Sequence, residues 1–518
     1  MSVDVVFVGA GVNSLAAAFL LGRAGLSVAV LEANDEPGGA IRTADVTLPG
    51  FRHDLGAMNL GAFVRSPFYA EHHQELADHG FEAVVADQSF GSVFAAGEFL
   101  GIGTDRRANL DAIAEVAPGD AAAWRRWSED FDACAPILGE ILQSPAGSGG
   151  PLAHLSGRGV DIPEDVRQTL RGILVDSLRA NLTRRFASDE VRVLVGAWGL
   201  HLDYAPDVAG GCWMPFLETN ADERNGISIA RGGSARLIEA MVGAVRSTGG
   251  ELRTRAPVDR IVVRHGRAVG VRLVDGNEVG ASRAVVASVT PPALARLTDG
   301  SLPAPAAAQA RGWRFGPGTL VIHLALSGPV EWSASQDAGQ SFYVHIGPSL
   351  DHLATVYEQG LAGTLAAEPF CVVAQPTVHD PSRAPGGRDV LWIMVRAVPA
   401  VIQGDVLDQI TGPQWTDTAK DVFANRVVGL LERHAPGLGG RILARRVFAP
   451  PDLERLNPNL VDGDLNAGSM HLDQFYGERP FGDGSRSPLP GLYVCGAATW
   501  PGGGTQPTSG MLVADLLR

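Results

Sequence analysis

Two glycines and one acidic residue near the start of the chain have types and a spacing that could do chemistry. The run VDVVFVGAGVNSLAAAF places Gly9 and Gly11 between an apolar segment and a segment with helical spacing. Glycine lets the backbone approach a pyrophosphate, whose charge is stabilised by free N–H groups at the start of a helix. Glu32 follows about 20 residues later, where a carboxylate accepts hydrogen bonds from a ribose and repels a 2′-phosphate. The pattern therefore predicts a dinucleotide-binding turn and disfavours NADP.

Ser14 occupies the third position of this pattern, where glycine is usual. That position serves the packing of the helix on the strand, and serine adds only a small side chain there. We therefore expect the phosphate site to be retained. The alternative is a simple glycine turn followed by an acidic residue on the surface.

The elements around these residues predict a βαβ unit. Apolar runs at 3–9 and 26–32 are typical of buried strands, and the segment 12–25 between them has helical spacing that ends at a glycine. Residues 66–225 show a mainly helical pattern, which indicates an inserted helical region.

The second half of the chain mixes both kinds of element. Residues 231–250 predict a helix, and 251–288 predict short strands joined by tight turns. Strands are expected in TLVIHLALSG and VLWIMVRAV, with a helix around TAKDVFANRVVGLLERH. The tail predicts a strand, a glycine-rich loop and a closing helix.

The composition excludes several classes of protein. The 518 residues are 45% hydrophobic and 19% charged, which is typical of an ordered chain with room for two domains. A formal net charge of −15 argues against binding to nucleic acid. Cys134, Cys212, Cys371 and Cys495 lack CxxC spacing, so neither a disulfide framework nor a zinc site is expected. With no signal peptide or membrane span indicated, we expect a cytoplasmic protein.

One cluster of polar residues elsewhere allows either a functional or a purely structural interpretation. Glu71, His72, His73 and Glu75 could bind a metal, but on a predicted helix they are expected to form a solvated face, so no metal site is predicted. No GxSxG turn occurs in the sequence.

Two histidine-containing segments leave alternatives open. His53 and Asp54 could lie beside a cofactor, or could structure the loop that carries them. His201, with Asp203 and Tyr204, could line a substrate cavity, or could be an ordinary core histidine.

Further motifs extend the first pattern along most of the chain. They are EPGGAIRT and GFRHDLGAMN, then RGGSARLIEAM with VDRIVV, and finally DLNAGSMHLDQFYGERP and GLYVCGAATWPGGG. Together with the glycine turn they resemble the amine oxidase and phytoene desaturase superfamily of FAD enzymes. The last two motifs resemble specifically its phytoene desaturase-related branch. The likeness covers the flavin-binding parts and is weak for residues 70–225.

The resemblance implies non-covalent FAD and suggests which residues bind it. The backbone of Val258 would meet the adenine, and the start of the last helix would stabilise negative charge on the reduced flavin. No catalytic side chain is assigned, because the flavin supplies much of the chemistry. The cofactor residues implied are Gly9, Gly11, Asn13, Ser14, Glu32, Ala33, Gly38, Gly39, Arg42, Gly56, Ala57, Met58, Asn59, Val258, Gly496, Ala497, Ser509, Gly510, Met511 and Leu512.

The fold class implied is α/β, with a Rossmann-like FAD-binding domain interleaved with a mixed α+β substrate domain. The FAD-binding parts are expected at 1–65, 226–290 and 489–518, and the helical and sheet parts of the substrate domain at 66–225 and 291–488. The expected reaction passes hydride to flavin N5 from an apolar, isoprenoid or polycyclic substrate. Oxygen, a quinone or another acceptor would reoxidise the flavin, and peripheral contact with a membrane is compatible with such a substrate.

Two alternatives stay open at this point. An amine or amino-acid oxidase of the same fold often has a lysine near flavin N5, and an escort-type protein would bind prenylated partners without FAD. Lys420 is the only lysine, and its spacing predicts the polar side or the first turn of a helix. Trp500 stands where relatives often carry histidine, so the shape of the site near the flavin is expected to differ.

Overall fold

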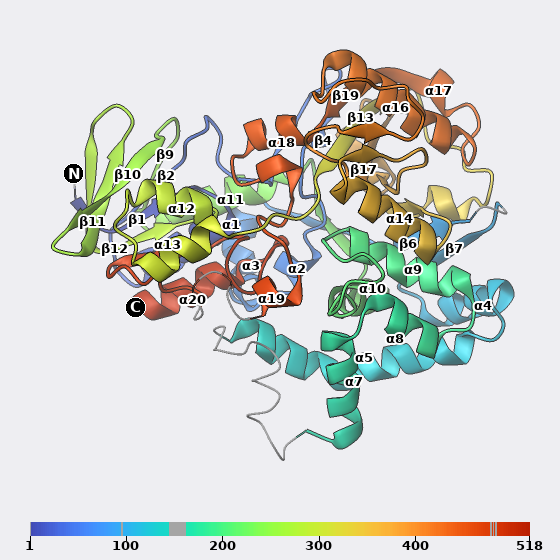
Figure 1. Cartoon of the computed structure of the whole chain (residues 1–518), viewed down its shortest axis with the longest axis horizontal. Helices are drawn as coiled ribbons and strands as arrows, with labels where there is room; N and C mark the ends of the chain where they lie inside the picture. Colours follow the sequence, from blue (N-terminus) through green and yellow to red (C-terminus); the bar gives the residue numbers. More distant parts are fainter. Residues whose placement is uncertain (1, 95–96, 145–161, 477–478, 480, 482–483) are drawn as a thin grey trace.

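Two bodies, each built around one large sheet, make up the computed structural model of the chain (Figure 1). The structure describes residues 2–94, 97–144, 162–476, 479, 481 and 484–518. Both ends of the chain lie in the body with strands β1, β10 and β12, called here the first body. This body therefore combines the beginning and the end of the sequence.

The sheet of the first body has the order β10-β11-β12-β1-β2-β9, with β20 paired to β12. β1 pairs in parallel with β12 and β2, whereas β10, β11 and β12 form an antiparallel edge. The run VVFV in β1 is buried on both faces, as expected for parallel strands covered by helices. The strands are β1 (Ser2–Val8), β2 (Val28–Leu31), β9 (Glu251–Arg253), β10 (Val258–Arg264), β11 (Arg267–Leu273), β12 (Glu278–Ala287) and β20 (Leu492–Val494).

Helices cover both faces of this sheet. On one face α1 (Val12–Arg23) packs against α11 (Ala235–Ser247) and α20 (Thr508–Leu517). On the other face the segment with α12 (Pro291–Leu297) and α13 (Ala304–Arg311) contributes to the core beneath the strands. The domain boundary expected after residue 290 would assign α12 and α13 to the substrate domain. In the structure they instead cover the sheet of the first body.

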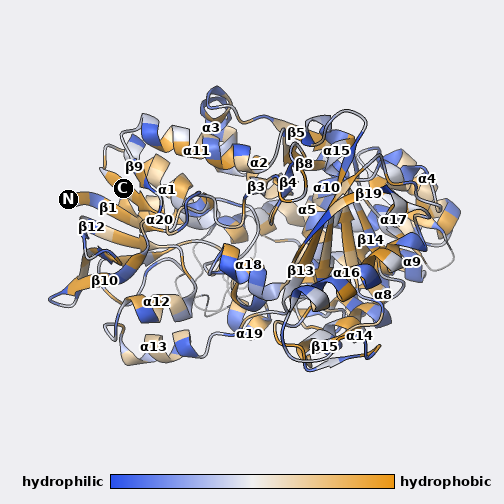
Figure 2. Cartoon of the chain, turned by 90° about the horizontal axis from the view of Figure 1, so that it is seen from above, coloured by the Kyte–Doolittle hydropathy of each residue, from blue (hydrophilic) through white to orange (hydrophobic). Residues whose placement is uncertain are grey.

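The second body has a sheet with the order β19-β13-β17-β16-β14-β6-β7. One face packs on α16 (Asp417–Glu432), and the other packs on the helices of residues 121–225. The hydrophobic colour of its central strands in Figure 2 reflects this double burial. The strands are β6 (Gln88–Val93), β7 (Phe99–Gly103), β13 (Thr319–Leu326), β14 (Tyr343–Ile346), β16 (Cys371–Ala374), β17 (Asp389–Arg396) and β19 (Ile442–Phe448).

The region 66–225 is less helical than its sequence pattern predicts. β6 and β7 form one edge of the second sheet, and β5 (Ala83–Ala86) pairs with β8 (Ile227–Ala230). These strands are short and lie between helices, so their two-residue alternation is weak in a longer window. The helices are α3 (Pro67–Asp78), α4 (Arg106–Val116), α5 (Ala121–Gln143), α7 (Glu164–Val175), α8 (Leu178–Arg185), α9 (Asp189–Leu200) and α10 (Trp213–Asn225).

Short elements complete the described fold. Among the described residues, no helix combines the length and the hydropathy that a membrane crossing requires. The remaining described strands and α-helices are β3 (Thr43–Ala44), β4 (His53–Asp54), α2 (Gly61–Val64), α14 (Leu350–Leu361), β15 (Thr364–Leu365), α15 (Pro376–His379), β18 (Gly404–Asp405), α17 (Leu438–Arg441), α18 (Pro450–Leu456) and α19 (Leu472–Phe475).

A buried ion-pair network at Arg383 joins segments from both bodies. The guanidinium donates to Asp54 Oδ2 at 2.6 Å and to Asp380 Oδ2 at 2.9 Å, and all three side chains are fully buried. Asp54 Oδ1 also accepts hydrogen bonds from Ser234 N and Oγ, both at 2.8 Å, and from Thr43 Oγ1 at 2.5 Å. The loop before β17, the start of α11 and the β3–β4 hairpin are therefore held at one charge cluster.

Arg383→Met should lower the free energy of unfolding by about 3–5 kcal/mol, because it removes the buried cation that pairs with Asp54 and Asp380. Arg433→Met is the matched control: Arg433 lies 2.7 Å from Glu368, but both side chains are about half exposed, at 54% and 51%. A surface pair of this kind contributes about 0–1 kcal/mol. Urea unfolding of the three proteins gives the comparison, and equal losses in the two variants would contradict the role of Arg383.

Candidate functional site

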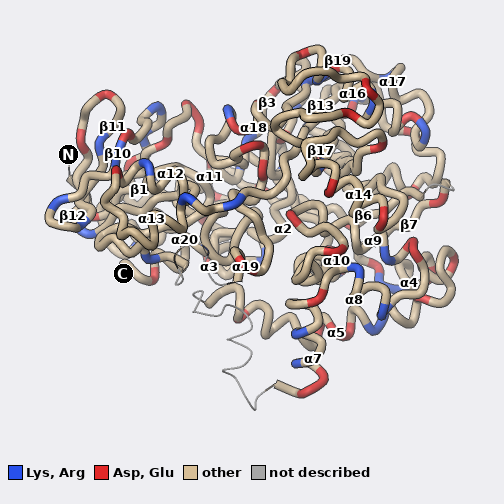
Figure 3. The backbone as a smooth tube through the Cα atoms, in the orientation of Figure 1, with Lys and Arg blue, Asp and Glu red and all other residues tan. Residues whose placement is uncertain are grey.

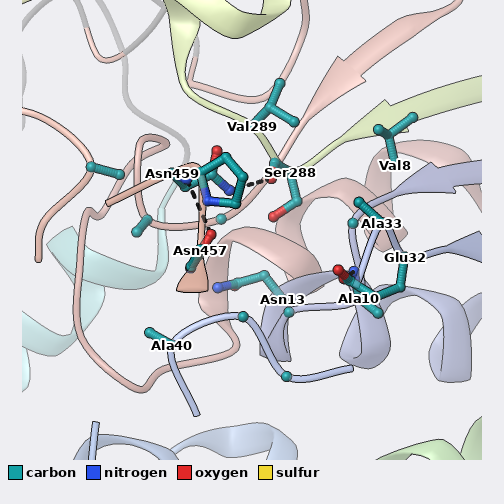
Figure 4. A pocket seen from close by; sticks show the side chains of 18 of the residues that line it. Val8, Ala10, Asn13, Glu32, Ala33, Ala40, Ser288, Val289, Asn457 and Asn459 are labelled. Carbon is teal, nitrogen blue, oxygen red and sulfur yellow. Dashed lines mark hydrogen bonds between the residues drawn. The ribbon is translucent and has the colours of Figure 1, made fainter. Parts of the chain in front are cut away.

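A groove of about 320 Å³ lies at the carboxyl ends of β1, β2 and β12 (Figure 4). Crevices at the carboxyl ends of parallel strands are where sheets of this type bind ligands. Residues from both bodies line this groove, which therefore lies where the two bodies meet. The lining comes from residues 8–13, 31–34, 38–41, 57, 256–258, 288–289, 293, 296–297, 457–460, 465, 467, 495–498 and 504–505.

The start of α1 gives the groove its affinity for an anion. Gly9 has a φ of +94°, which L side chains rarely adopt, and turns the chain from β1 into the helix. Gly11 is the N-cap residue, so no side chain caps the helix, and a Cβ there would meet nothing within 4 Å. The amides of the first turn and the positive end of the helix dipole therefore favour a pyrophosphate at this position.

Glu32 is fixed at the end of β2 by two backbone hydrogen bonds. Its Oε2 accepts from Ala10 N and its Oε1 accepts from Asn34 N, both at 2.9 Å, and the residue is only 7% exposed. A carboxylate has about four lone-pair positions, so acceptor capacity remains for ribose hydroxyls. Ala33 and Val258 line the same groove. This end of the groove thus fits a ribose and an adjoining adenine.

The start of α20 meets the start of α1 at Asn13. Asn13 Oδ1 accepts hydrogen bonds from Ser509 Oγ at 2.8 Å and from Gly510 N at 3.0 Å. A Cβ on Gly510 would clash with the Asn13 backbone carbonyl, so glycine is required for this approach. Figure 4 shows the Asn13 side chain projecting into the pocket.

The amides at the start of α20 are less available than the resemblance implies. The amide of Gly510 is bonded to Asn13, and the amide of Met511 donates to the Pro507 carbonyl at 3.1 Å. The positive end of the helix dipole, rather than these two N–H groups, is therefore the feature of α20 that can stabilise negative charge nearby.

The structure brings many, but not all, of the predicted cofactor residues to the groove. Those that line it are Gly9, Gly11, Asn13, Glu32, Ala33, Gly38, Gly39, Ala57, Val258, Gly496 and Ala497. Those outside its lining are Ser14, Arg42, Gly56, Met58, Asn59, Ser509, Gly510, Met511 and Leu512.

Several residues outside the lining support the groove from behind. Ser14 is buried with its Oγ 3.7 Å from the Cys495 Sγ, which joins α1 to the loop after β20. Burial raises the pKa of the Cys495 thiol to about 11. Arg42 Nη1 donates to the Leu456 carbonyl at 3.3 Å, while its buried Nε has no partner in the part of the chain that the structure describes.

The lining also includes residues that the sequence pattern does not indicate. Asn459 Nδ2 donates to the Ser288 carbonyl at 2.9 Å, and Asn459 N donates to Asn457 Oδ1 at 3.1 Å (Figure 4). Ser288 directly follows β12, which pairs in parallel with β1. Once this pairing is known, a residue at the carboxyl end of β12 is expected beside the ligand. Asn457 and Asn459 follow α18, far away in sequence, and carry no comparable signal.

The prediction that His72 lies on a solvated face of α3 is wrong. This residue is 2% exposed, and its ring packs edge-on against Phe19 and Phe68 at centroid distances of 5.0 and 5.1 Å. Burial lowers the pKa of His72, whereas its neighbour His73 is exposed. Within the described residues, no group of three or more His, Cys, Asp or Glu side chains could hold a metal ion.

His53 and Asp54 have loop-structuring contacts. Asp54 belongs to the Arg383 network, and the His53 ring nitrogen Nε2 lies 2.8 Å from Thr47 Oγ1. The ring of His53 also packs edge-on against His323 at 5.2 Å, and burial lowers the pKa of His53 to about 4. Neither His53 nor Asp54 lines the groove.

His201 forms a neutral pair with a second histidine. Its Nε2 lies 2.8 Å from His345 Nε2, and its ring stacks on Trp198 at 4.4 Å. Burial lowers the pKa of both histidines, that of His345 to about 3, so one neutral ring donates and the other accepts. His201 does not line the groove.

Asp203 and Tyr204 anchor a loop that does reach the groove. Asp203 Oδ2 accepts from Ser469 Oγ at 2.8 Å, and Tyr204 Oη donates to the Met470 carbonyl at 3.0 Å. Ala467, in the same loop, lines the groove. Asp203 and Tyr204, which belong to the second body, therefore position the part of the groove that this loop forms.

Lys420 is less exposed than its spacing predicts. It lies in the first turn of α16, as expected, but its side chain is only 16% exposed. Its Nζ is 2.9 Å from Asp417 and 3.4 Å from Asp452, a residue of α18. The lysine is absent from the lining of the groove.

Comparisons with known proteins agree with this geometry. The family model described as flavin containing amine oxidoreductase matches residues 15–509. Pyridine nucleotide-disulfide oxidoreductase domain-containing protein 2 of Mus musculus is 27% identical over 560 residues, covering 99% of this chain and 93% of the relative. The neurosporene-forming phytoene desaturase of Rhodobacter capsulatus is 27% identical over 525 residues, with the same coverage of each. The solved structure of putrescine oxidase bound to putrescine has a TM-score of 0.61 at 17% identity, covers 100% and 98% of the two chains, and shows a common fold.

The groove fits the cofactor of this family. The uncapped start of α1 suits a pyrophosphate, and Glu32 retains acceptor positions for a ribose. The fold is α/β, with a Rossmann-like FAD-binding part and a substrate domain. The chain belongs to the flavin-containing amine oxidoreductase family, and it is an FAD-dependent oxidoreductase.

Proposed function

We propose that this enzyme removes hydride from an apolar substrate of the isoprenoid or polycyclic class and forms a double bond or another oxidised product. The observation that carries the proposal is the similarity to the neurosporene-forming phytoene desaturase of Rhodobacter capsulatus, which is 27% identical and matches 99% of this chain. A hollow between α5, α7 and the loop that precedes α20 has no charged side chain among its described lining residues, which suits a hydrocarbon, and its space of about 10 Å³ is that of about one water molecule. The hollow is lined by Leu138, Ile141, Leu142, Leu174, Trp213, Phe475, Tyr476 and Trp500.

Aromatic rings in contact with one another line this hollow. Phe475 stacks on Trp213 with ring centroids 5.4 Å apart, and its ring lies 5.2 Å from that of Trp500. Trp500 Nε1 donates to the Ser144 carbonyl at 3.0 Å, so the polar edge of the indole is satisfied. Trp500, the departure from the family pattern, thus adds apolar surface in place of an ionisable ring.

The chain's own residues bind and orient the cofactor. The start of α1 would hold the pyrophosphate, Glu32 the ribose, and the lining around Ala57, Ala497 and Thr505 the flavin end. When bound, FAD supplies the hydride-accepting chemistry. The protein's contribution is to place the substrate carbon next to the cofactor and to exclude water from that contact.

Amine oxidation is the weaker alternative. The phytoene desaturase relative is similar along nearly its whole length, whereas putrescine oxidase shares the fold at 17% identity. Lys420 is held by Asp417 and Asp452 outside the groove, which opposes a lysine–water–N5 arrangement. An escort-type protein without flavin has no support, because the family consists of flavin enzymes.

The acceptor and the location of the enzyme belong to the same proposal. We infer that oxygen, a quinone or another acceptor reoxidises the flavin, and that peripheral contact with a membrane delivers the apolar substrate. All four cysteines are free and buried, in keeping with a reducing cytoplasm. Acidic and basic residues are interspersed over the described chain without a long basic stretch (Figure 3), and the net charge of −15 opposes nucleic-acid binding.

Anaerobic screening tests the proposed substrate class. The FAD-loaded protein is mixed with isoprenoid hydrocarbons, polycyclic compounds and, as the comparison set, primary amines, and the flavin absorbance band is followed. Bleaching by a hydrocarbon and none by the amines is expected. Bleaching by amines alone would contradict the proposal and favour an amine oxidase, while leaving FAD binding intact.

Glu32→Ala should weaken FAD binding by about 1.5–3 kcal/mol, because it removes an ionised acceptor of ribose hydrogen bonds. Fluorimetric titration of the apoprotein with FAD measures this change. Glu71→Ala, which removes an acidic side chain that is 75% exposed, is the control and should leave the dissociation constant unchanged. A dissociation constant for Glu32→Ala equal to that of the wild type would return Glu32 to a structural role.

Lys420→Met should leave the FAD content, and the rate of flavin reduction by a substrate found in the screen, within a factor of about three. A residue acting in the transition state is typically worth about 10²-fold or more. Stopped-flow reduction of the two proteins side by side gives the comparison. A hundredfold loss with the fold intact would move the enzyme toward the amine oxidases.

A further inference from the structure

Arg479 is a buried cation without an ion-pair partner in the described part of the chain. The residue is 2% exposed, and no described carboxylate lies within 4.0 Å of its guanidinium nitrogens. Instead the guanidinium donates to the carbonyls of Asn466 at 2.6 Å, Ser469 at 3.3 Å and Ala497 at 2.9 Å. Burial lowers the pKa of Arg479 to about 10, which keeps it charged at neutral pH.

The carbonyls that hold Arg479 belong to the wall of the cofactor groove. Ala497 lines the groove, and Asn466 stands between Leu465 and Ala467, which both line it. Glu32 and Val258 mark the ribose and adenine end, so this wall lies toward the flavin end. The positive charge therefore lies directly behind backbone that lines this part of the groove.

The described residues around the Arg479 guanidinium fix it in place but leave one of its N–H donors without a hydrogen-bond acceptor. The guanidinium carbon lies 5.7 Å from the centre of the Trp313 ring and 5.4 Å from that of Phe475. Arg479 Nε and the neighbouring Asn466 Nδ2 are buried donors without partners among the described residues. A buried donor left unpaired is unfavourable, so these two N–H groups suit an environment completed by a ligand with acceptor atoms.

The nearest acidic side chains are occupied by neutral donors. Asp464 Oδ2 accepts from Gly316 N at 3.0 Å and from Gly468 N at 2.8 Å. Asp203 accepts from Tyr357 Oη and from Ser469 Oγ, both at 2.8 Å. These carboxylates reduce the field of Arg479 at longer range, but neither pairs with it directly.

We propose that Arg479 is a positioning residue that raises the reduction potential of the bound FAD. The inference rests on the FAD binding described above and goes beyond the proposed substrate. Uptake of two electrons and one proton leaves one negative charge on the flavin ring. A fixed cation behind a buried wall stabilises that charge more strongly than water does, because the local dielectric constant is low.

Arg479→Gln should lower the equilibrium constant for two-electron reduction at least tenfold, which corresponds to about 30 mV. The potential is measured on the FAD-loaded protein by slow reduction in the presence of a reference dye. Sulfite adds to oxidised flavin and also leaves a negative charge on the ring, so its dissociation constant should rise at least tenfold. Arg479→Lys keeps the charge and should stay within about threefold of the wild type in both measurements.

Arg314→Gln is the matched control. Arg314 pairs with Asp473 at 2.7 Å beside the same loop, but the two side chains are 54% and 65% exposed. Its removal should change the equilibrium constant less than twofold. An unchanged potential in Arg479→Gln, or equal shifts in Arg479→Gln and Arg479→Lys, would overturn the proposal in favour of a purely structural role.

A second variant covers the case in which Arg479→Gln does not retain FAD. Asn466→Asp keeps Arg479 and places a negative charge in the same wall, so it should also lower the equilibrium constant at least tenfold. A potential equal to that of the wild type would overturn the proposal. Failure of FAD binding itself would appear separately, as a wild-type protein without a flavin spectrum.

Discussion

The contact between the first and the last helix is the constraint on which the cofactor groove depends. Asn13 and Gly510 are 497 residues apart, yet the Asn13 side chain accepts the Gly510 amide, and no Cβ fits between them. The contact brings the positive ends of α1 and α20 to one place, where an anion offsets their mutual repulsion. A pyrophosphate bound at α1 meets this electrostatic requirement, and the end of the chain closes the groove that its beginning opens.

The second body completes the site through one loop. Residues 464–470 contribute Leu465 and Ala467 to the groove and are held from behind by Asp203, Tyr204 and Arg479. The position of this part of the groove therefore depends on side chains of the second body. The apolar side chains of Phe475 and Trp500 lie next to the same loop.

Local motifs made much of the groove predictable, and distant packing did not. Gly9, Gly11 and Glu32 lie within one βαβ unit, so their spacing alone defines an anion site and an acidic strand end. Asn457 and Asn459 reach the groove only because the second body folds over it, and His72 is buried only because α3 packs against Phe19 of α1. Packing between distant segments also explains why β6 and β7 are strands in a region with a helical sequence pattern. It explains as well why residues 291–311 cover the first sheet.

The spectrum of the purified protein tests the central claim, that this groove holds FAD without a covalent bond. The protein is purified without added cofactor, its visible absorbance is recorded, and the supernatant is examined after denaturation by acid or heat. The account predicts a flavin band in the native protein and FAD in the supernatant at about one molecule per chain. Flavin retained by the pellet would contradict non-covalent binding, and the absence of flavin, together with no uptake of added FAD, would contradict the assignment of the groove.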